Sequence, residues 1–204
     1  LPPRPQHPGR LKYKMGNKEV RHMLALAPNW LGDTVMCTPA FRALRLKFPN
    51  ARFTVAANPT CCDLLEDLPW IDGLFRLLPK SSLLPLMRQA KQLAPVSSDL
   101  TLVFPHSFRS ALLARFIGSK QRVGYARDGR APLLTHAPAP HMEGGHITPI
   151  YMASEYLELA GVVGAGAAVS RTGVRAHPPR PRADRDGGRH DLPRSRNCVR
   201  VLTA

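Results

Sequence analysis

The sequence predicts an α/β fold of the Rossmann type, in which helices cover both faces of a parallel sheet. Short apolar runs alternate along the chain with segments whose apolar residues recur at helical spacing, and the links between them are short. Repeated β–α units of this kind form parallel sheets. The chain has 204 residues, 44% of them hydrophobic, so one domain with a sizeable core is expected over residues 23–163.

Five short runs are predicted as strands. The first, from Met23 to Pro28, is apolar and ends at turn residues, as a buried strand does. The runs that follow have similar length and also end at turn-forming residues. The predicted strands span 23–28, 52–57, 73–78, 99–104 and 122–125.

Five helices are predicted between and after these strands. In the first, Arg45 is expected on the outer face with the neighbouring cations. Ser107 is a predicted N-cap, and Gly118 stands where a C′ glycine belongs. The last helix is expected to open at Thr148–Pro149, with proline at N1, and to close at Gly161. The predicted helices span 35–48, 59–67, 81–93, 107–117 and 148–161.

The turns after three strands, at 28–34, 58–60 and 105–108, are the expected place for a site. In open parallel sheets, ligands bind at the carboxyl ends of the strands. All three turns lie at that edge of the predicted sheet.

The turn Asn29-Trp30-Leu31-Gly32-Asp33 allows two interpretations. In one, Asp33 caps the helix and Gly32 makes the turn. In the other, Asp33 is a base at the ligand edge. The single glycine does not make a GxGxxG fingerprint, which disfavours a dinucleotide site. Trp30 can stack on a sugar face, although a buried core position is the more frequent role of tryptophan.

The positive charge is concentrated at the two ends of the chain. The net charge is +15, of which residues 1–22 carry +5 and residues 166–204 carry +6. The body is therefore only mildly basic, and the C-terminal segment has no aromatic residue on which a base could stack. A nucleic-acid partner is not expected.

Both ends are expected to lie outside the folded domain. Residues 164–204 are rich in Arg, Pro and Gly, and such a composition predicts a disordered basic tail. Nine arginines without a lysine after residue 165 favour a translated wrong reading frame over a genuine tail. Residues 1–22 are expected to be disordered or non-native, with Met23 or Met15 as the native start.

Cysteine and histidine spacing predicts no metal site. The four cysteines form no CxxC pair, so unlinked reduced thiols are expected. His136, His141 and His146 have no regular spacing. No stretch reaches the roughly 18 to 20 apolar residues of a membrane span, and no signal peptide is visible, so a cytoplasmic location is expected.

Three segments carry an ordered set of more specific motifs. They are APNWLGDTVMCTPAFRALRLKFPNARFTVAA (27–57), LVFPHSFRSALLARFIGSKQRVGYARDGR (102–130) and HITPIYMASEYLELAG (146–161). The first holds a strand, a P-N-W-L-G-D-T-V-M turn and a basic helix. The second holds a P-H-S-F-R-S-A-L helix start and a G-x-x-x-R-x-G turn. Over about 23–163 the chain resembles the heptosyltransferase family of lipopolysaccharide core synthesis, especially the second heptosyltransferase.

The resemblance implies a glycosyltransferase of the GT-B type with two Rossmann-like domains and an inverting mechanism. The N-terminal domain would hold the acceptor, a phosphorylated Kdo-heptose core on lipid A. The donor, ADP-L-glycero-β-D-manno-heptose, would occupy a C-terminal domain. No cofactor is implied, and a Mg²⁺ requirement stays open. Such a protein would work peripherally, at the cytoplasmic face of the inner membrane.

The resemblance also assigns candidate roles. Asp33 matches the family's motif aspartate and is the candidate base for the acceptor hydroxyl. Cationic and helix-start groups are expected to bind the anionic acceptor. For any one arginine a solvated surface position remains as an alternative, and Ser107 can be only a cap. The candidate substrate-binding residues are Asn29, Trp30, Gly32, His106, Ser107, Arg109, Arg122, Arg127 and Arg130.

The sequence departs from the family after Gly161. The expected donor-binding domain has no matching residues in the last forty or so positions. The chain is therefore expected to be truncated and inactive in transfer by itself. The alternative is a non-enzymatic module that binds an anionic glycan or a membrane surface.

Overall fold

The computed structural model describes residues 19–165, apart from 79–82, 95–98, 144–145 and 149. The predictions for the two ends fall almost wholly outside these residues, as does the predicted start of the helix at 81–93. No described helix is long and apolar enough to cross a bilayer. Cys37, Cys61 and Cys62 are buried free thiols.

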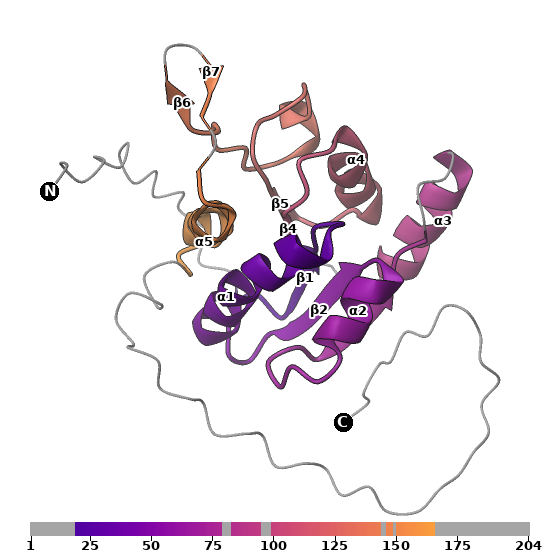
Figure 1. Cartoon of the computed structure of the whole chain (residues 1–204). Helices are drawn as coiled ribbons and strands as arrows, with labels where there is room; N and C mark the ends of the chain where they lie inside the picture. Colours follow the sequence, from indigo (N-terminus) through magenta and orange to yellow (C-terminus); the bar gives the residue numbers. More distant parts are fainter. Residues whose placement is uncertain (1–18, 79–82, 95–98, 144–145, 149, 166–204) are drawn as a thin grey trace, which may run out of the picture.

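The body is built on a five-stranded parallel sheet, which confirms the predicted fold class. Its strand order is β3-β2-β1-β4-β5, with β1 at the centre (Figure 1). All four neighbouring pairs run parallel. The strands lie where the sequence predicts them, within a few residues. They are β1 (His22–Leu26), β2 (Arg52–Ala57), β3 (Gly73–Arg76), β4 (Leu100–Val103) and β5 (Gln121–Val123).

Helices cover both faces of this sheet, because alternate residues of each strand point to opposite sides. In β1, Met23 and Ala25 pack into one core and Leu24 and Leu26 into the other. The first core lies under α1 (Leu31–Lys47), α2 (Pro59–Leu65) and α5 (Met152–Val162), and α1 and α5 lie side by side (Figure 1). The second core lies under α3 (Leu83–Leu93) and α4 (Phe108–Ile117).

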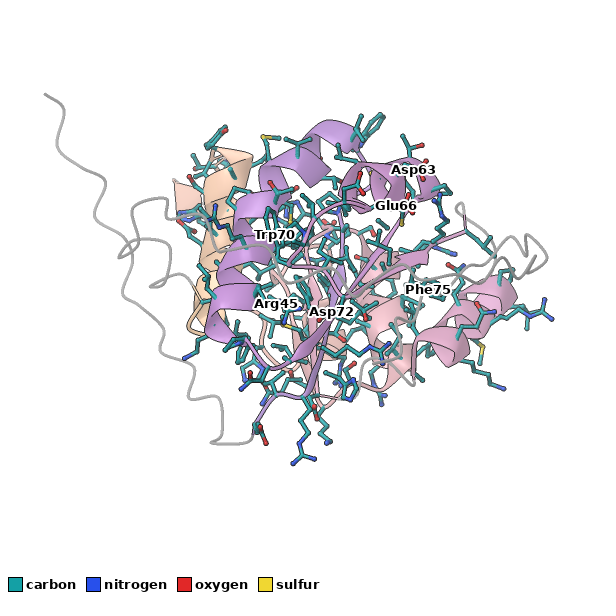
Figure 2. The ribbon with its side chains drawn as sticks, turned by 90° about the horizontal axis from the view of Figure 1, so that it is seen from below. Arg45, Asp63, Glu66, Trp70, Asp72 and Phe75 are labelled. Atoms are coloured by element: carbon teal, nitrogen blue, oxygen red, sulfur yellow. The ribbon has the colours of Figure 1, made fainter. Side chains whose placement is uncertain are left out.

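The predicted outward position of Arg45 is wrong. Its side chain is almost fully buried and donates hydrogen bonds to the carbonyls of Trp70 (2.9 Å), Pro49 (3.1 Å) and Ala51 (2.7 Å). It also forms an ion pair with Asp72, and Figure 2 shows the two residues together with Trp70. The helix period alone misses this role, because the burial comes from the loop before β3 closing over the end of α1.

The last helix also differs from the sequence prediction at both ends. It begins at Met152 rather than at Thr148–Pro149, because the chain before it forms a small antiparallel pair, β6 (Met142–Glu143) with β7 (His146–Ile147). Gly161 lies inside the helix. The helix is terminated instead at Gly164, whose φ is 81°. There the amide of Ala165 donates to Ala160 and that of Gly164 to Gly161, a Schellman arrangement.

Gly118 plays the predicted role at the end of α4. Its φ of 80° places it in the left-handed region, where a side chain would be strained. The chain can therefore turn sharply from α4 towards β5.

Candidate functional site

The site candidates gather at the carboxyl edge of the sheet, at the point between β1 and β4. After β1 the chain leaves into α1 on one face, and after β4 it leaves into α4 on the opposite face. The two connections diverge there, and ligands of doubly wound sheets generally bind at such a switch point. Asp33 lies in the first turn of α1, and His106 lies just before the start of α4.

The turn after β1 does not match the capping interpretation of Asp33. The N-cap of α1 is Trp30, and it makes no side-chain cap hydrogen bond. Asp33 is the third helical residue, where the helix dipole favours a negative charge. Gly32 is the second helical residue, and a Cβ built there meets nothing within 4 Å. Asp33 therefore stands in the first turn of α1, and Gly32 leaves open space beside it.

Side chains from the next turn fix this segment. Nδ2 of Asn58 donates to the carbonyl of Asn29 (2.6 Å), while its Oδ1 accepts from the amide of Cys61 (2.8 Å) at the start of α2. The hydroxyl of Thr34 donates to the carbonyl of Trp30 (3.1 Å). The backbone of the turn is thus held from both sides before any ligand arrives.

Trp30 is 77% exposed, so the buried-core interpretation is wrong for it. An exposed indole offers a flat apolar face that can stack on a sugar ring. The Asn29 side chain is also exposed. Both residues have the accessibility that a binding role requires.

Two predicted residues, His106 and Arg127, come together with a third that was not predicted, Glu155 of α5. Nη1 of Arg127 lies 2.9 Å from Nδ1 of His106. Nε2 of His106 lies 2.9 Å from Oε1 of Glu155, and Nη2 of Arg127 lies 3.9 Å from the same oxygen. These contacts join the segments that follow β4 and β5 to α5.

The arginine defines which nitrogen of His106 carries the proton. A guanidinium has only donors, so Nδ1 of His106 must accept from Arg127. The proton of the ring then sits on Nε2, which lies 2.9 Å from Oε1 of Glu155 without the angle of a hydrogen bond. Burial opposes the charge on Glu155, but His106, Arg127 and His141 favour it, and together they hold the pKa of Glu155 below its usual value.

Tyr156, the neighbour of Glu155 on α5, is influenced by the charges of both Glu155 and Asp33. Burial raises the pKa of Tyr156, and the nearby carboxylates of Asp33 and Glu155 raise it further. The ring of Tyr156 therefore lies within electrostatic range of both acids. The hydroxyl of Tyr125 donates to the carbonyl of Glu155 (3.0 Å), which anchors α5 to the segment after β5.

Arg130 is neither a surface charge nor an open ligand group. Its side chain is fully buried, and burial lowers its pKa to about 10. Its guanidinium donates to the carbonyls of Tyr125 (2.8 Å), Pro105 and Ser107 (3.3 Å). Arg130 thus braces the start of α4 against the loop after β5.

The remaining predicted residues occupy different positions. Arg122 donates to the carbonyls of Leu133 (2.9 Å) and Ser119 (2.6 Å). It lies next to Val123, which faces the α1–α5 core, so strand alternation directs Arg122 to the other face. Ser107 caps α4 by accepting from the amide of Ser110 (3.3 Å). Arg109 lies half-buried in the first turn of α4. Among the residues that the structure describes, no group of three or more His, Cys, Asp or Glu side chains could hold a metal ion.

Comparisons with known proteins show what the chain resembles in sequence and in fold. The chain is 30% identical over 115 residues to lipopolysaccharide heptosyltransferase 2 of Escherichia coli, covering 55% of this chain and 33% of that protein. The solved structure of E. coli ADP-heptose LPS heptosyltransferase II superposes with a TM-score of 0.58 at 26% identity, over 68% of this chain and 40% of that one. Over this part of its length, the chain is similar in sequence and in fold to heptosyltransferases.

A second solved structure supports the fold of this heptosyltransferase relative. The glycosyl transferase family 9 protein from Veillonella parvula superposes with a TM-score of 0.62 at 19% identity, over 72% of this chain and 43% of that one. No family model matches the chain. The chain spans about a third of the length of the curated heptosyltransferases it matches.

Glu155 is the residue of the candidate site that sequence reasoning missed. A signal for it exists, because Glu155 falls on the buried stripe of α5 with Tyr156, Leu159 and Ala160. An acid on an apolar stripe is rarely buried without a partner. The helical period of α5 therefore predicts a buried charge, although it does not predict which cations pair with it.

Proposed function

We propose that this chain forms the acceptor-binding half of a heptosyltransferase and binds a phosphorylated Kdo-heptose acceptor of the lipopolysaccharide inner core. The observation that supports this most is the position of Asp33. It stands in the first turn of α1, at the switch point between β1 and β4, and Trp30 at the N-cap of the same helix is exposed. The relatives named above are heptosyltransferases of lipopolysaccharide, which supplies the substrate class.

In this proposal, Asp33 is the general base. It takes the proton of the acceptor hydroxyl as the hydroxyl oxygen attacks the anomeric carbon of the donor heptose. A carbon–oxygen bond forms there, and the bond from that carbon to the phosphate oxygen breaks on the opposite side, so ADP leaves with the electron pair and the configuration inverts. ADP-heptose would be held by a donor-binding half of the two-domain GT-B arrangement.

The other candidate residues would either contact the acceptor or hold the backbone around the site. Trp30 would stack on a sugar face, and the open space at Gly32 would let the acceptor approach the turn. Arg127, positioned by His106 and Glu155, and Arg109 at the start of α4 would face the acceptor's negative charge. Arg130 and Arg122 act indirectly, since their guanidinium groups bond backbone carbonyls.

Acceptor binding tests the proposal without requiring transfer. The purified chain is titrated with phosphorylated and dephosphorylated Kdo-heptose oligosaccharide, and tryptophan fluorescence is recorded. The expected result is saturable quenching by the phosphorylated sugar that Trp30→Phe removes, with binding weakened on the order of tenfold by dephosphorylation. No binding of either oligosaccharide would refute an acceptor-binding function.

The role of Asp33 is tested by transfer. In a chain extended with a donor-binding half, ADP release is compared between the parent and Asp33→Asn. If Asp33 is the base, kcat falls on the order of 10²–10⁴-fold while acceptor affinity changes little. Equal rates would exclude Asp33 as the base and leave an anionic-glycan binding module as the better interpretation.

A further inference from the structure

Helix α3 has two opposite faces of different character. Leu86, Ala90 and Leu93 pack into the core under the sheet. On the other side a shallow hollow is lined by Leu84, Met87, Arg88 and Lys91, which follow one another at helical spacing. Leu84 is 78% exposed and Met87 is 42% exposed. The outer stripe of α3 is thus apolar at its start and cationic at its end.

The neighbouring helix α4 repeats this pattern. It packs against α3 on the same face of the sheet. Phe108 and Phe116 are 49% and 39% exposed, and Arg115 is also exposed between them in sequence. Large apolar side chains and cations are therefore combined on the outer sides of both helices.

The charges of the two helical layers differ in kind. Within the described helices α3 and α4 the charged residues are Arg88, Lys91, Arg109 and Arg115, and none is acidic. The layer on the opposite face mixes the two signs, with Arg42 and Lys47 in α1 beside Asp33, Asp63 in α2 and Glu158 in α5. Of the two described helical layers, the α3–α4 layer therefore carries cations without acids and is the better match to an anionic surface.

We propose that the outer surface of α3 and α4 docks on an anionic lipid bilayer. A helix that lies in the interface plane presents apolar side chains to the acyl boundary and cations to the headgroups, which is the arrangement found on α3. Leu84 and Met87 would enter the bilayer surface, while Arg88, Lys91 and Arg115 would contact lipid phosphates.

This surface goes beyond the proposed function, since vesicle binding needs neither acceptor nor donor. It also has a geometric consequence for the site. Helix α4 begins at the carboxyl edge of the sheet, directly after His106 and Ser107. A protein that docks through α3 and α4 therefore brings this edge, with its candidate site, close to the lipid surface.

The test is sedimentation of the full chain with vesicles of phosphatidylethanolamine and phosphatidylglycerol, and with vesicles of phosphatidylcholine alone. The variant Leu84→Asp/Met87→Asp is compared with the parent. The matched control is Leu46→Asp/Leu64→Asp, which adds the same charge at two exposed apolar residues on the opposite layer. The basic ends of the chain are identical in all three proteins. Their attraction to the vesicles therefore cancels when the binding of the variants is compared with that of the parent.

The expected result is binding to the anionic vesicles that falls on the order of tenfold or more in L84D/M87D and by less than about threefold in L46D/L64D. Matching circular dichroism spectra would show that both variants fold. Equal binding by the parent and L84D/M87D, or equal losses in both variants, overturns the proposal. The proposal is also overturned if the parent self-associates, L84D/M87D is monomeric, and the parent binds vesicles no better than that variant. This face would then be an interface between copies of the chain.

Discussion

His106 and Glu155 meet across the site, with Nε2 of the histidine 2.9 Å from Oε1 of the glutamate. His106 follows β4, whereas Glu155 lies on α5. The Glu155 side chain is only 5% exposed, so its charge depends on His106 and Arg127 for compensation. This contact connects the segment after β4 to the helix that packs along α1.

Replacing Glu155 with Gln is expected to destabilise the fold by about 2–3 kcal/mol, because Arg127 is left without its buried counter-charge. This expected loss of stability is smaller than the loss for a fully buried ion pair, since His106 and Arg127 remain partly exposed. Urea unfolding measures the change in the free energy of unfolding.

The matched control is Glu158→Gln on the same helix. Glu158 pairs with His141 at 2.6 Å, but both side chains are about a third exposed. Water screens this pair, so a loss of less than about 1 kcal/mol is expected. Similar losses for the two variants would contradict a special role for Glu155.

The stability of the sheet is expected to fall in acid through Asp99. Burial opposes its charge, but the amides of His22 and Arg21 and the ammonium of Lys120 hydrogen-bond to it, and these contacts hold the pKa of Asp99 below 3.8. A carboxylate with a lowered pKa stabilises the fold above its unfolded pKa, and this contribution is lost as the pH falls through the folded pKa.

Asp99→Asn is therefore expected to cost about 1–2 kcal/mol at neutral pH, where charge-assisted hydrogen bonds are lost. The gap between parent and variant should shrink below about pH 4, as Asp99 of the parent becomes protonated. Denaturant unfolding of both proteins at several pH values measures this difference in the free energy of unfolding. A gap that stays constant in acid would show that the charge of Asp99 is not the cause.

Two glycines at the edge of the sheet are expected to respond oppositely to alanine. At Gly124 an added Cβ would lie 3.2 Å from Cβ and the carbonyl oxygen of Val103, so Gly124→Ala should cost about 1–3 kcal/mol. At Gly32 the space is open, so Gly32→Ala should stabilise helix α1 by roughly half a kcal/mol. Thermal unfolding compares them. Destabilisation by Gly32→Ala would mean that the turn needs glycine for its backbone.

Arg130→Lys is expected to loosen the start of α4, because one ammonium cannot replace a fork that reaches the carbonyls of Tyr125, Pro105 and Ser107. A loss of about 2 kcal/mol is expected, with faster amide exchange at Ser110. Arg115→Lys on the exposed side of α4 is the control and should stay within about 0.5 kcal/mol. An unchanged exchange rate in Arg130→Lys would argue against the bracing role.

The candidate site was only partly predictable from sequence. Asp33, Trp30 and His106 follow strands that the apolar runs identify, and the rule for parallel sheets brings such positions to one edge. Arg130 lies in the same matched segment as Arg127, yet one is sealed in the interior and the other meets His106. Sequence spacing does not distinguish them, because burial depends on how the loop after β5 folds over α4.

The sequence by itself determined the alternation of strands and helices, the parallel sheet and the edge at which a site would form, since these depend on local apolar periodicity and turn residues. The tertiary structure alone decided which charges are buried. Arg45 turns inward because the loop before β3 supplies carbonyls and Asp72, and Glu155 is kept charged because His106 and Arg127 arrive from distant strands. A buried charge needs partners, and partners far apart in the chain become neighbours only when the sheet assembles.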